Sequence, residues 1–169
     1  FTFPIEDYYK RVGFDFDKIP FSMLAHEYME DYQEKSYACD LHSDVLDVVN
    51  KAKNLGFSQT VLSASKMDYL LKQMETLHVD DLFDSIYGIN DIYAKSKVEL
   101  AHAFKQTCSL DDEIYFVGDS VHDYEVAKSI GAKCILVTTG HQNRATLESV
   151  NVPVMDSLME SLDLIYERD

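Results

Sequence analysis

Basic side chains are scarce in this chain of 169 residues: 15 lysines and arginines stand against 30 aspartates and glutamates, for a formal net charge of −15. Nucleic-acid backbones select surfaces rich in lysine and arginine, so this balance argues against nucleic acid as a partner. Long apolar runs are also missing, since none approaches the ~20 residues of a membrane-spanning helix. The first residues do not form a basic segment followed by an apolar one, so no secretory signal is expected.

Cysteine is rare as well. Cys39, Cys108 and Cys134 are odd in number and contain no C-x-x-C pair, so neither a disulfide framework nor a zinc site is indicated. Cys134 begins the apolar run 134–137, so we expect it to be a buried, unreactive thiol. Reduced thiols without a targeting segment predict a cytoplasmic protein that has no membrane partner.

The first forty residues are rich in aromatic and acidic side chains. Met23, Leu24, Tyr28 and Tyr32 recur at helical spacing, which predicts an amphipathic helix over residues 21–37. No strand pattern is present in this segment. We therefore expect residues 1–39 to be a small helical subdomain or part of one.

From Leu41 onward, short apolar runs alternate with amphipathic segments of about ten residues. This alternation is typical of βαβ units, and it predicts an α/β fold with a parallel sheet and helices on both faces. The expected strands are 60–63, 84–87, 114–117, 133–137 and 152–154, and the expected helices are 43–55, 68–77, 96–107, 123–130, 144–150 and 157–166.

Polar residues gather where these strands end, which is where parallel sheets bind their ligands. Ser63-Ala64-Ser65 follows one strand, Gly118-Asp119 and Asp123 follow another, and Lys95 and Lys97 lie where a helix begins. Two carboxylates suit Mg²⁺, which commonly takes one or two carboxylates with waters and substrate phosphate. A serine hydroxyl, the backbone N–H groups after it and a lysine can hold phosphoryl oxygens.

Each of these residues also has an ordinary structural interpretation. Asp119 alone would be a helix N-cap, Ser63 a turn residue, and Asp123 and either lysine solvated charges. Their combination at one edge of a sheet is what indicates a site.

The motifs Val61-Leu62-Ser63 and Gly118-Asp119-Ser120-Val121-His122-Asp123, with a lysine at 95–97 between them, resemble motifs two, four and three of the haloacid dehalogenase-like hydrolases. The helical segment before Gly56 and the run 127–140 are similar to the phosphoglycolate phosphatase and β-phosphoglucomutase-like branch. The resemblance covers about residues 41–166. It implies a Rossmann-like core and a Mg²⁺-dependent phosphatase of small phosphorylated metabolites that acts through an aspartyl-phosphate.

The resemblance also implies a role for each matching residue. Ser63 would bind the phosphoryl group together with Ala64 and Ser65, and Asp119 and Asp123 would hold Mg²⁺ directly or through water. Lys97 would neutralise the nucleophile and the phosphate; Lys95 is the alternative, because Lys95-Ser96-Lys97 replaces the Lys-Pro of this branch. Two other functions stay open, a sugar-phosphate mutase and a non-catalytic member that binds a phosphorylated ligand or a protein.

The nucleophile of the family lies in a first motif, Asp-x-Asp-Gly-Thr, at the end of a strand. Asp15-Phe16-Asp17 invites this assignment, but Lys10 and Arg11 would be buried unpaired in such a strand, and Lys18-Ile19-Pro20 stands in place of Gly-Thr. The spacing between Asp15 and Ser63 would suit a family member that has no cap domain, so Asp15 remains the alternative nucleophile. We expect instead that residues 1–39 are part of a helical cap, that residues 40–169 are a core lacking its first strand, and that the nucleophile lies upstream of residue 1.

Overall fold

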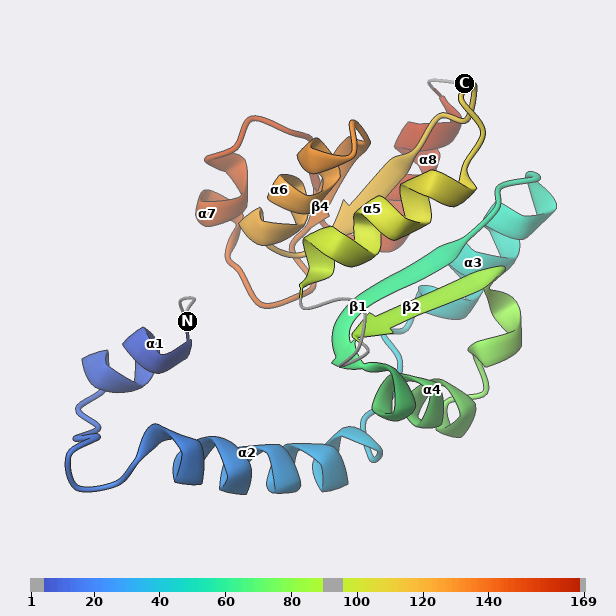
Figure 1. Ribbon diagram of the computed structural model, residues 1–169. Coiled ribbons are helices and arrows are strands. Elements are labelled where there is room, and N and C mark those ends of the chain that lie inside the picture. Colours follow the sequence, from blue (N-terminus) through green and yellow to red (C-terminus); the bar gives the residue numbers. More distant parts are fainter. Residues whose placement is uncertain (1–4, 90–95, 168–169) are drawn as a thin grey trace. The chain divides into compact units, whose positions relative to one another are not determined.

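The computed structural model describes residues 5–89 and 96–167, and the chain divides into two compact units, Phe1–Asp40 and Leu41–Asp169 (Figure 1). In the first unit the structure describes two helices, α1 (Ile5–Arg11) and α2 (Phe21–Ser36). The helix predicted over 21–37 is therefore confirmed. Edge-to-face aromatic contacts join the two helices, with ring centroids 6.2 Å apart for Tyr9 and Phe21.

Asp15 lies in the turn between α1 and α2 and does not follow a strand. Its carboxylate accepts a hydrogen bond from the backbone N–H of Asp17 at 3.1 Å and pairs with Lys18 at 2.9 Å. The Lys18 ammonium holds the pKa of Asp15 below its usual value. The prediction that no strand precedes Asp15 is confirmed, because the residues before this turn form α1.

The second unit has the predicted alternation, and its strands pair only in parallel within the described residues. The chain therefore has a mixed α/β fold of the Rossmann-like type. Its strands are β1 (Thr60–Lys66), β2 (Ser85–Ile89), β3 (Tyr115–Gly118), β4 (Lys133–Val137) and β5 (Val154–Met155). Its helices are α3 (Val45–Asn54), α4 (Met67–Thr76), α5 (Lys97–Thr107), α6 (Val121–Ser129), α7 (Arg144–Glu148) and α8 (Leu158–Tyr166), with a short 3₁₀ helix at Asp80–Leu82.

The parallel strands form two sheets instead of the single predicted one, β1–β2 and β3–β4–β5. Within the described residues, β1 pairs only with β2 and β3 only with β4, so each has an open edge. The helices nevertheless bridge the two sheets, because α5 packs on β1, β2 and α6, while α3 packs on α8 beside β4. The helices therefore pack across the boundary between the two sheets.

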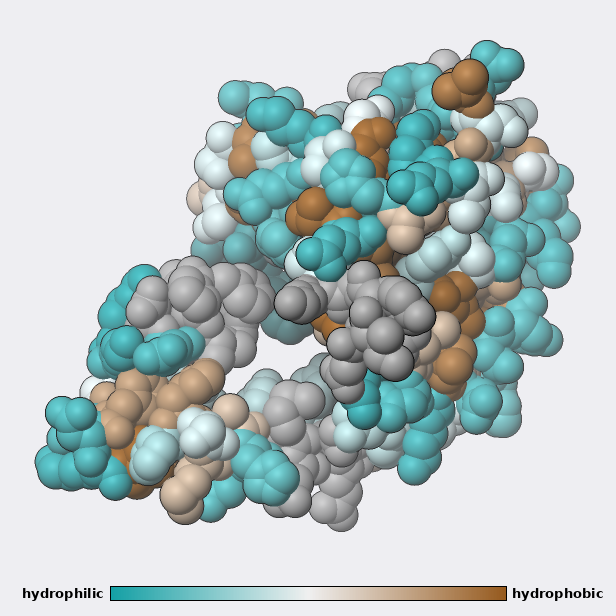
Figure 2. All heavy atoms as spheres, viewed as in Figure 1, coloured by the Kyte–Doolittle hydropathy of each residue, from teal (hydrophilic) through white to brown (hydrophobic). Residues whose placement is uncertain are grey.

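The core is deepest around β4, which follows the helix end at Gly131. The run Cys134–Val137 is buried along its whole length, as a strand covered on both faces requires. The predicted burial of Cys134 is confirmed, and that burial raises the pKa of its thiol to about 12, which keeps the thiol protonated. Hydrophilic residues cover most of the visible face of this unit (Figure 2). In the described ranges, no helix has the length and apolar character to cross a membrane.

Leu136 tests this core, because its side chain is fully buried in the cluster formed by Ala127, Cys134 and Leu147. Leu136→Ala should lower the free energy of unfolding by about 2–5 kcal/mol, through lost burial and the cavity left behind. Leu110→Ala, at a fully exposed leucine, is the matched control and should change it by less than about 0.5 kcal/mol. Urea denaturation followed by circular dichroism measures both, and equal effects would contradict this placement of the core.

Candidate functional site

The turn after β3 is organised by a capping box. Ser120 is the N-cap of α6: its hydroxyl accepts from the backbone N–H of Asp123 at 3.3 Å, and the Asp123 carboxylate accepts from the Ser120 N–H at 3.0 Å. The helix therefore begins at Val121, and its predicted start at Asp123 was two residues late. The alternative role of Asp119 as the N-cap is wrong, since Ser120 occupies that position.

Asp123 is a buried carboxylate, with a relative exposure of 3%. Its Oδ2 accepts from the Asp119 N–H at 3.1 Å and from the Ser120 hydroxyl at 2.7 Å, besides the capping-box bond, and its Oδ1 accepts from Lys97 Nζ at 2.5 Å. The carboxylate packs against Gly118, where a Cβ atom would overlap the Asp123 side chain. Asp123 is therefore no solvated helix residue, and its two oxygens are already engaged by protein donors.

Lys97 is the first residue of α5. The Ser96 hydroxyl caps this helix by accepting from the Glu99 N–H at 3.3 Å, which fixes the point where Lys97 leaves the backbone. The Lys97 side chain is only 19% exposed, and its Nζ also lies 5.6 Å from the centroid of the Phe116 ring. The structure thus brings Lys97 onto the motif after β3, whereas Lys95 lies outside the described residues.

Asp119 follows β3 directly and is held by one oxygen. Its Oδ2 accepts from the backbone N–H of His141 at 2.7 Å and lies 2.9 Å from His141 Nδ1. Partial burial alone would raise the pKa of Asp119, but these contacts with His141 outweigh it and hold that pKa below its ordinary value. In the described part of the chain, no donor reaches Oδ1.

The sequence did not reveal the contribution of the loop between β4 and α7. Besides His141, this loop supplies Gln142, whose Oε1 accepts from the Val121 N–H at 2.8 Å in the first turn of α6. The position of these residues was the available signal, because Gly140 and His141 follow the buried run Cys134–Val137, and β4 is the hydrogen-bonded neighbour of β3. His122, in contrast, is exposed and pairs with Glu125 at 3.1 Å.

Ser63 lies at an irregularity of β1. The pairing of β1 with β2 shifts between Leu62 and Lys66, and the Ser63 hydroxyl accepts from the Ser65 N–H at 3.1 Å within this bulge. Bulges of this kind often redirect side chains near active sites. Among the described residues Ser63 forms no hydrogen bond with Lys97, Asp119 or Asp123. Helix α4 starts only at Met67, so the N–H groups expected directly after Ser63 belong to the bulge and not to a helix.

The strand ends are connected through the core beneath them. Leu62, the residue before Ser63, packs on a cluster formed by Ala101 in α5, Val126 in α6 and Ile130 just after α6, as does Phe116 of β3. Both β1 and β3 therefore pack on the same apolar cluster.

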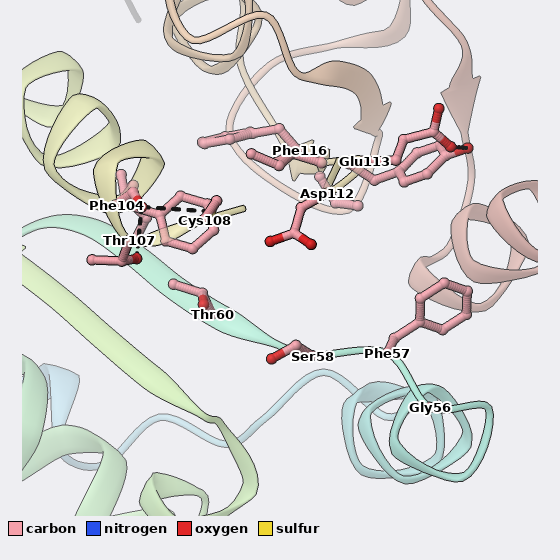
Figure 3. Close-up of a pocket in the computed structure, with 14 residues that line it drawn as sticks. Gly56, Phe57, Ser58, Thr60, Phe104, Thr107, Cys108, Asp112, Glu113 and Phe116 are labelled. Atoms are coloured by element: carbon pink, nitrogen blue, oxygen red, sulfur yellow. Dashed lines mark hydrogen bonds between the residues drawn. The ribbon is translucent and has the colours of Figure 1, made fainter. Parts of the chain in front are cut away.

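One cavity of the second unit is separate from these polar residues. It has a volume of about 520 Å³ and lies along the open edges of β1 and β3, between Ser58, Thr60 and Leu62 on one wall and Ile114–Val117 on the other. Figure 3 shows Asp112 directed into this space, with Ser58 and Thr60 across from it. A second cavity of about 340 Å³ touches the same two strands and is also lined by α3 and α8. Neither cavity is lined by Ser63, Lys97, Asp119 or Asp123.

The carboxylates of Asp119 and Asp123 supply only part of what a magnesium site requires. Within the described ranges, no group of three His, Cys, Asp and Glu side chains could enclose a metal ion. Asp119 can still offer Oδ1, and Mg²⁺ is typically held by one or two carboxylates with waters and substrate phosphate. Asp123 has both oxygens bonded to protein donors, so any contact it makes with a metal through water must compete with them.

Asp123→Ala tests the buried carboxylate. Removal of this side chain leaves the Lys97 ammonium without its carboxylate partner in a mostly buried position, and it also removes the capping box. We expect a loss of about 3–5 kcal/mol in the free energy of unfolding. The control is Glu125→Ala on the exposed side of α6, which should cost less than about 0.5 kcal/mol. Similar urea midpoints for both variants would refute the structural importance of Asp123.

Comparisons with known proteins agree with this architecture. A family model described as haloacid dehalogenase-like hydrolase matches residues 1–137. A haloacid dehalogenase-like family hydrolase from Streptococcus pneumoniae aligns with a TM-score of 0.81 and 20% identity, over 92% of this chain and 73% of its own. Protein tyrosine kinase A of Mycobacterium tuberculosis aligns with a TM-score of 0.75 and 20% identity, over 94% of this chain and 76% of its own.

A third similar structure comes from the branch indicated by the motifs. A predicted phosphoglycolate phosphatase from Haemophilus somnus aligns with a TM-score of 0.64 and 19% identity, over 79% of this chain and 61% of its own. No curated protein sequence matches the chain significantly. At these identities the structural similarity establishes the fold. Because the similar structures include a phosphatase and a tyrosine kinase, the chemistry of this chain has to be inferred from its site.

Proposed function

The chain belongs to the haloacid dehalogenase-like hydrolase family, and we propose that it forms most of a Mg²⁺-dependent phosphatase that hydrolyses small phosphorylated metabolites, as in the phosphoglycolate phosphatase-like branch. The observation that carries this proposal is the arrangement after β3. There a buried carboxylate, Asp123, holds the Lys97 ammonium at 2.5 Å. Asp119 lies beside it, and its Oδ1 accepts no hydrogen bond from the described residues.

Lys97 supplies positive charge in a position that excludes most water. Its side chain is 19% exposed, so its attraction for a phosphoryl oxygen is screened less than that of a surface lysine. Asp123 keeps the ammonium from turning into solvent. Asp119 is the residue that would hold Mg²⁺, with Asp123 acting directly or through water, and the ion when bound neutralises charge on the phosphoryl group. Ser63, together with Ala64 and Ser65, would bind the phosphoryl group, and the Ser63 hydroxyl would donate a hydrogen bond to a phosphoryl oxygen.

The reaction needs a nucleophilic carboxylate, and we propose that residues preceding Phe1 carry it on a strand that occupies the gap between β1 and β3. The open edges of both strands line the same cavity, which is lined by Thr60 and Leu62 of β1 and by Tyr115 and Val117 of β3. Since the amino ends of β1 and β3 line the cavity together, a third strand parallel to both would end at the level of Ser63 and Asp119. Its following residue would then enter the site beside Lys97.

Such a strand would have to be apolar on both faces. One face would meet Leu62, Phe104 and Phe116, and the other would meet the group of apolar side chains from α3, α8 and β3 that lines the second cavity. At the end of the strand, the carboxylate oxygen attacks phosphorus as the ester P–O bond breaks, and the leaving alcohol takes a proton from a neighbouring acid. Water then attacks the aspartyl-phosphate, releasing inorganic phosphate and restoring the carboxylate.

Turnover of p-nitrophenyl phosphate with Mg²⁺ tests the function. We expect no turnover by residues 1–169, and turnover once the natural upstream residues are included. Asp119→Asn in that longer protein should lower kcat/KM by about 100-fold or more, because the metal loses a charged ligand. Asp15→Asn is the control and should have no effect. Activity of the 169-residue chain that Asp15→Asn abolishes would contradict the proposal, as would phosphate binding without turnover by the longer protein.

A synthetic peptide tests the strand separately from the chemistry. Its sequence is five alternating valines and isoleucines followed by Asp-Leu-Asp-Gly-Thr, and it should raise the melting temperature of residues 1–169 by burying the open edges. Val117→Lys, at a position 37% exposed on β3, should abolish this shift, whereas Leu110→Lys should preserve it. The same peptide with proline at its centre should not bind, because proline removes a ladder donor. A shift that survives Val117→Lys would exclude the gap as the binding site.

A further inference from the structure

The loop that joins β4 to α7 contributes three consecutive residues to the turn after β3, although the proposed chemistry uses none of them. Gly140 and His141 contact Asp119, and Gln142 contacts the first turn of α6. These contacts join positions about twenty residues apart in the chain, and they meet at Asp119, directly after β3, and at Val121, two residues further on.

Gly140 is placed where no other residue fits. A Cβ atom at this position would overlap the Oδ2, Cβ and Cγ atoms of Asp119, because the carboxylate lies directly against the loop backbone. Gly140 does not have a positive φ angle, so the close approach of Asp119, and not backbone conformation, is the reason for a glycine here.

His141 adds two contacts to the same carboxylate oxygen. Its backbone N–H donates to Asp119 Oδ2 at 2.7 Å, and its ring Nδ1 lies 2.9 Å from that oxygen, as expected for the tautomer with the proton on Nδ1. Every described side-chain hydrogen bond of Asp119 therefore falls on Oδ2. Gln142 fixes the other side of the turn, since its Oε1 accepts from the Val121 N–H at 2.8 Å.

We propose that Gly140 and His141 are positioning residues that anchor Asp119 through Oδ2 and so present Oδ1 to a divalent cation. The inference rests on the proposed function in one respect, the role of Asp119 as a metal ligand. An aspartate without such an anchor samples several rotamers, and binding a cation would then have to select one of them. Partners that orient a metal ligand commonly change metal affinity by 10- to 100-fold.

Mg²⁺ binding to the 169-residue chain, measured by isothermal titration calorimetry with MgCl₂ alone, tests this role without requiring activity. Gly140→Ala should weaken Mg²⁺ affinity at least 10-fold, because the new methyl group displaces Asp119. His141→Ala should weaken it by about 10-fold, because only the backbone contact remains. His141→Asn should recover part of the loss, because its amide N–H can replace Nδ1–H. The matched control is His122→Ala, at the exposed histidine beside Glu125, which should leave affinity unchanged.

The variants separate the inference from the proposed function. Asp119→Asn should abolish binding, and if it does not, the metal role of Asp119 fails whatever the loop variants do. If Asp119→Asn abolishes Mg²⁺ binding while His141→Ala binds Mg²⁺ as tightly as the unaltered chain, the anchoring role of His141 is refuted and the metal role of Asp119 stands. Tighter binding by His141→Ala would also overturn it, since His141 would then compete with the cation. If circular dichroism shows that Gly140→Ala does not fold, the comparison of His141→Ala with His141→Asn still tests the anchoring role. Absence of Mg²⁺ binding by the unaltered chain would overturn the inference.

Discussion

The buried contact between Asp123 and Lys97 is the interaction on which the rest of the site depends. A carboxylate that is 3% exposed is stable as a charge only if donors surround it, and here they come from the turn after β3 and from the start of α5. Its contact with Lys97 through Oδ1 fixes the position of the lysine and joins α5 to α6, while its Oδ2 closes the first turn of α6 through the capping box with Ser120. Gly118 is required for the same reason, since its missing side chain makes room for the carboxylate.

The parts of the fold that local chemistry determines were predictable. The strand 133–137 was correct at both ends, because the buried run Cys134–Val137, preceded by the helix-ending Gly131, has few alternatives. The start of α6 was wrong because a capping box moves the helix start to Val121, ahead of the apolar periodicity. Strand β1 extends beyond its predicted end at Ser63, because a bulge interrupts its pairing without ending the strand.

Three of the residues that the motifs pointed to lie close together, but the geometry in which they meet was not predictable from the sequence. Lys97, Asp119 and Asp123 were identified from the motifs, and the structure places them around one turn. That Asp123 faces the lysine while Asp119 faces His141 depends on contacts across 26 and 22 residues, and no local pattern encodes them. The separation into two sheets likewise arises from the pairing of strands far apart in the chain, and not from the pattern within any one of them.

The open edges of β1 and β3 also have a consequence for the chain in solution. Interior strands of a parallel sheet have no need of the charged residues, prolines or twists that natural edge strands use against pairing with other molecules. Val117 already exposes 37% of its surface along such an edge. The net charge of −15 opposes close approach of two copies, and salt screens that repulsion. Self-association of these 169 residues should therefore begin at the open edges of β1 and β3 and increase with ionic strength.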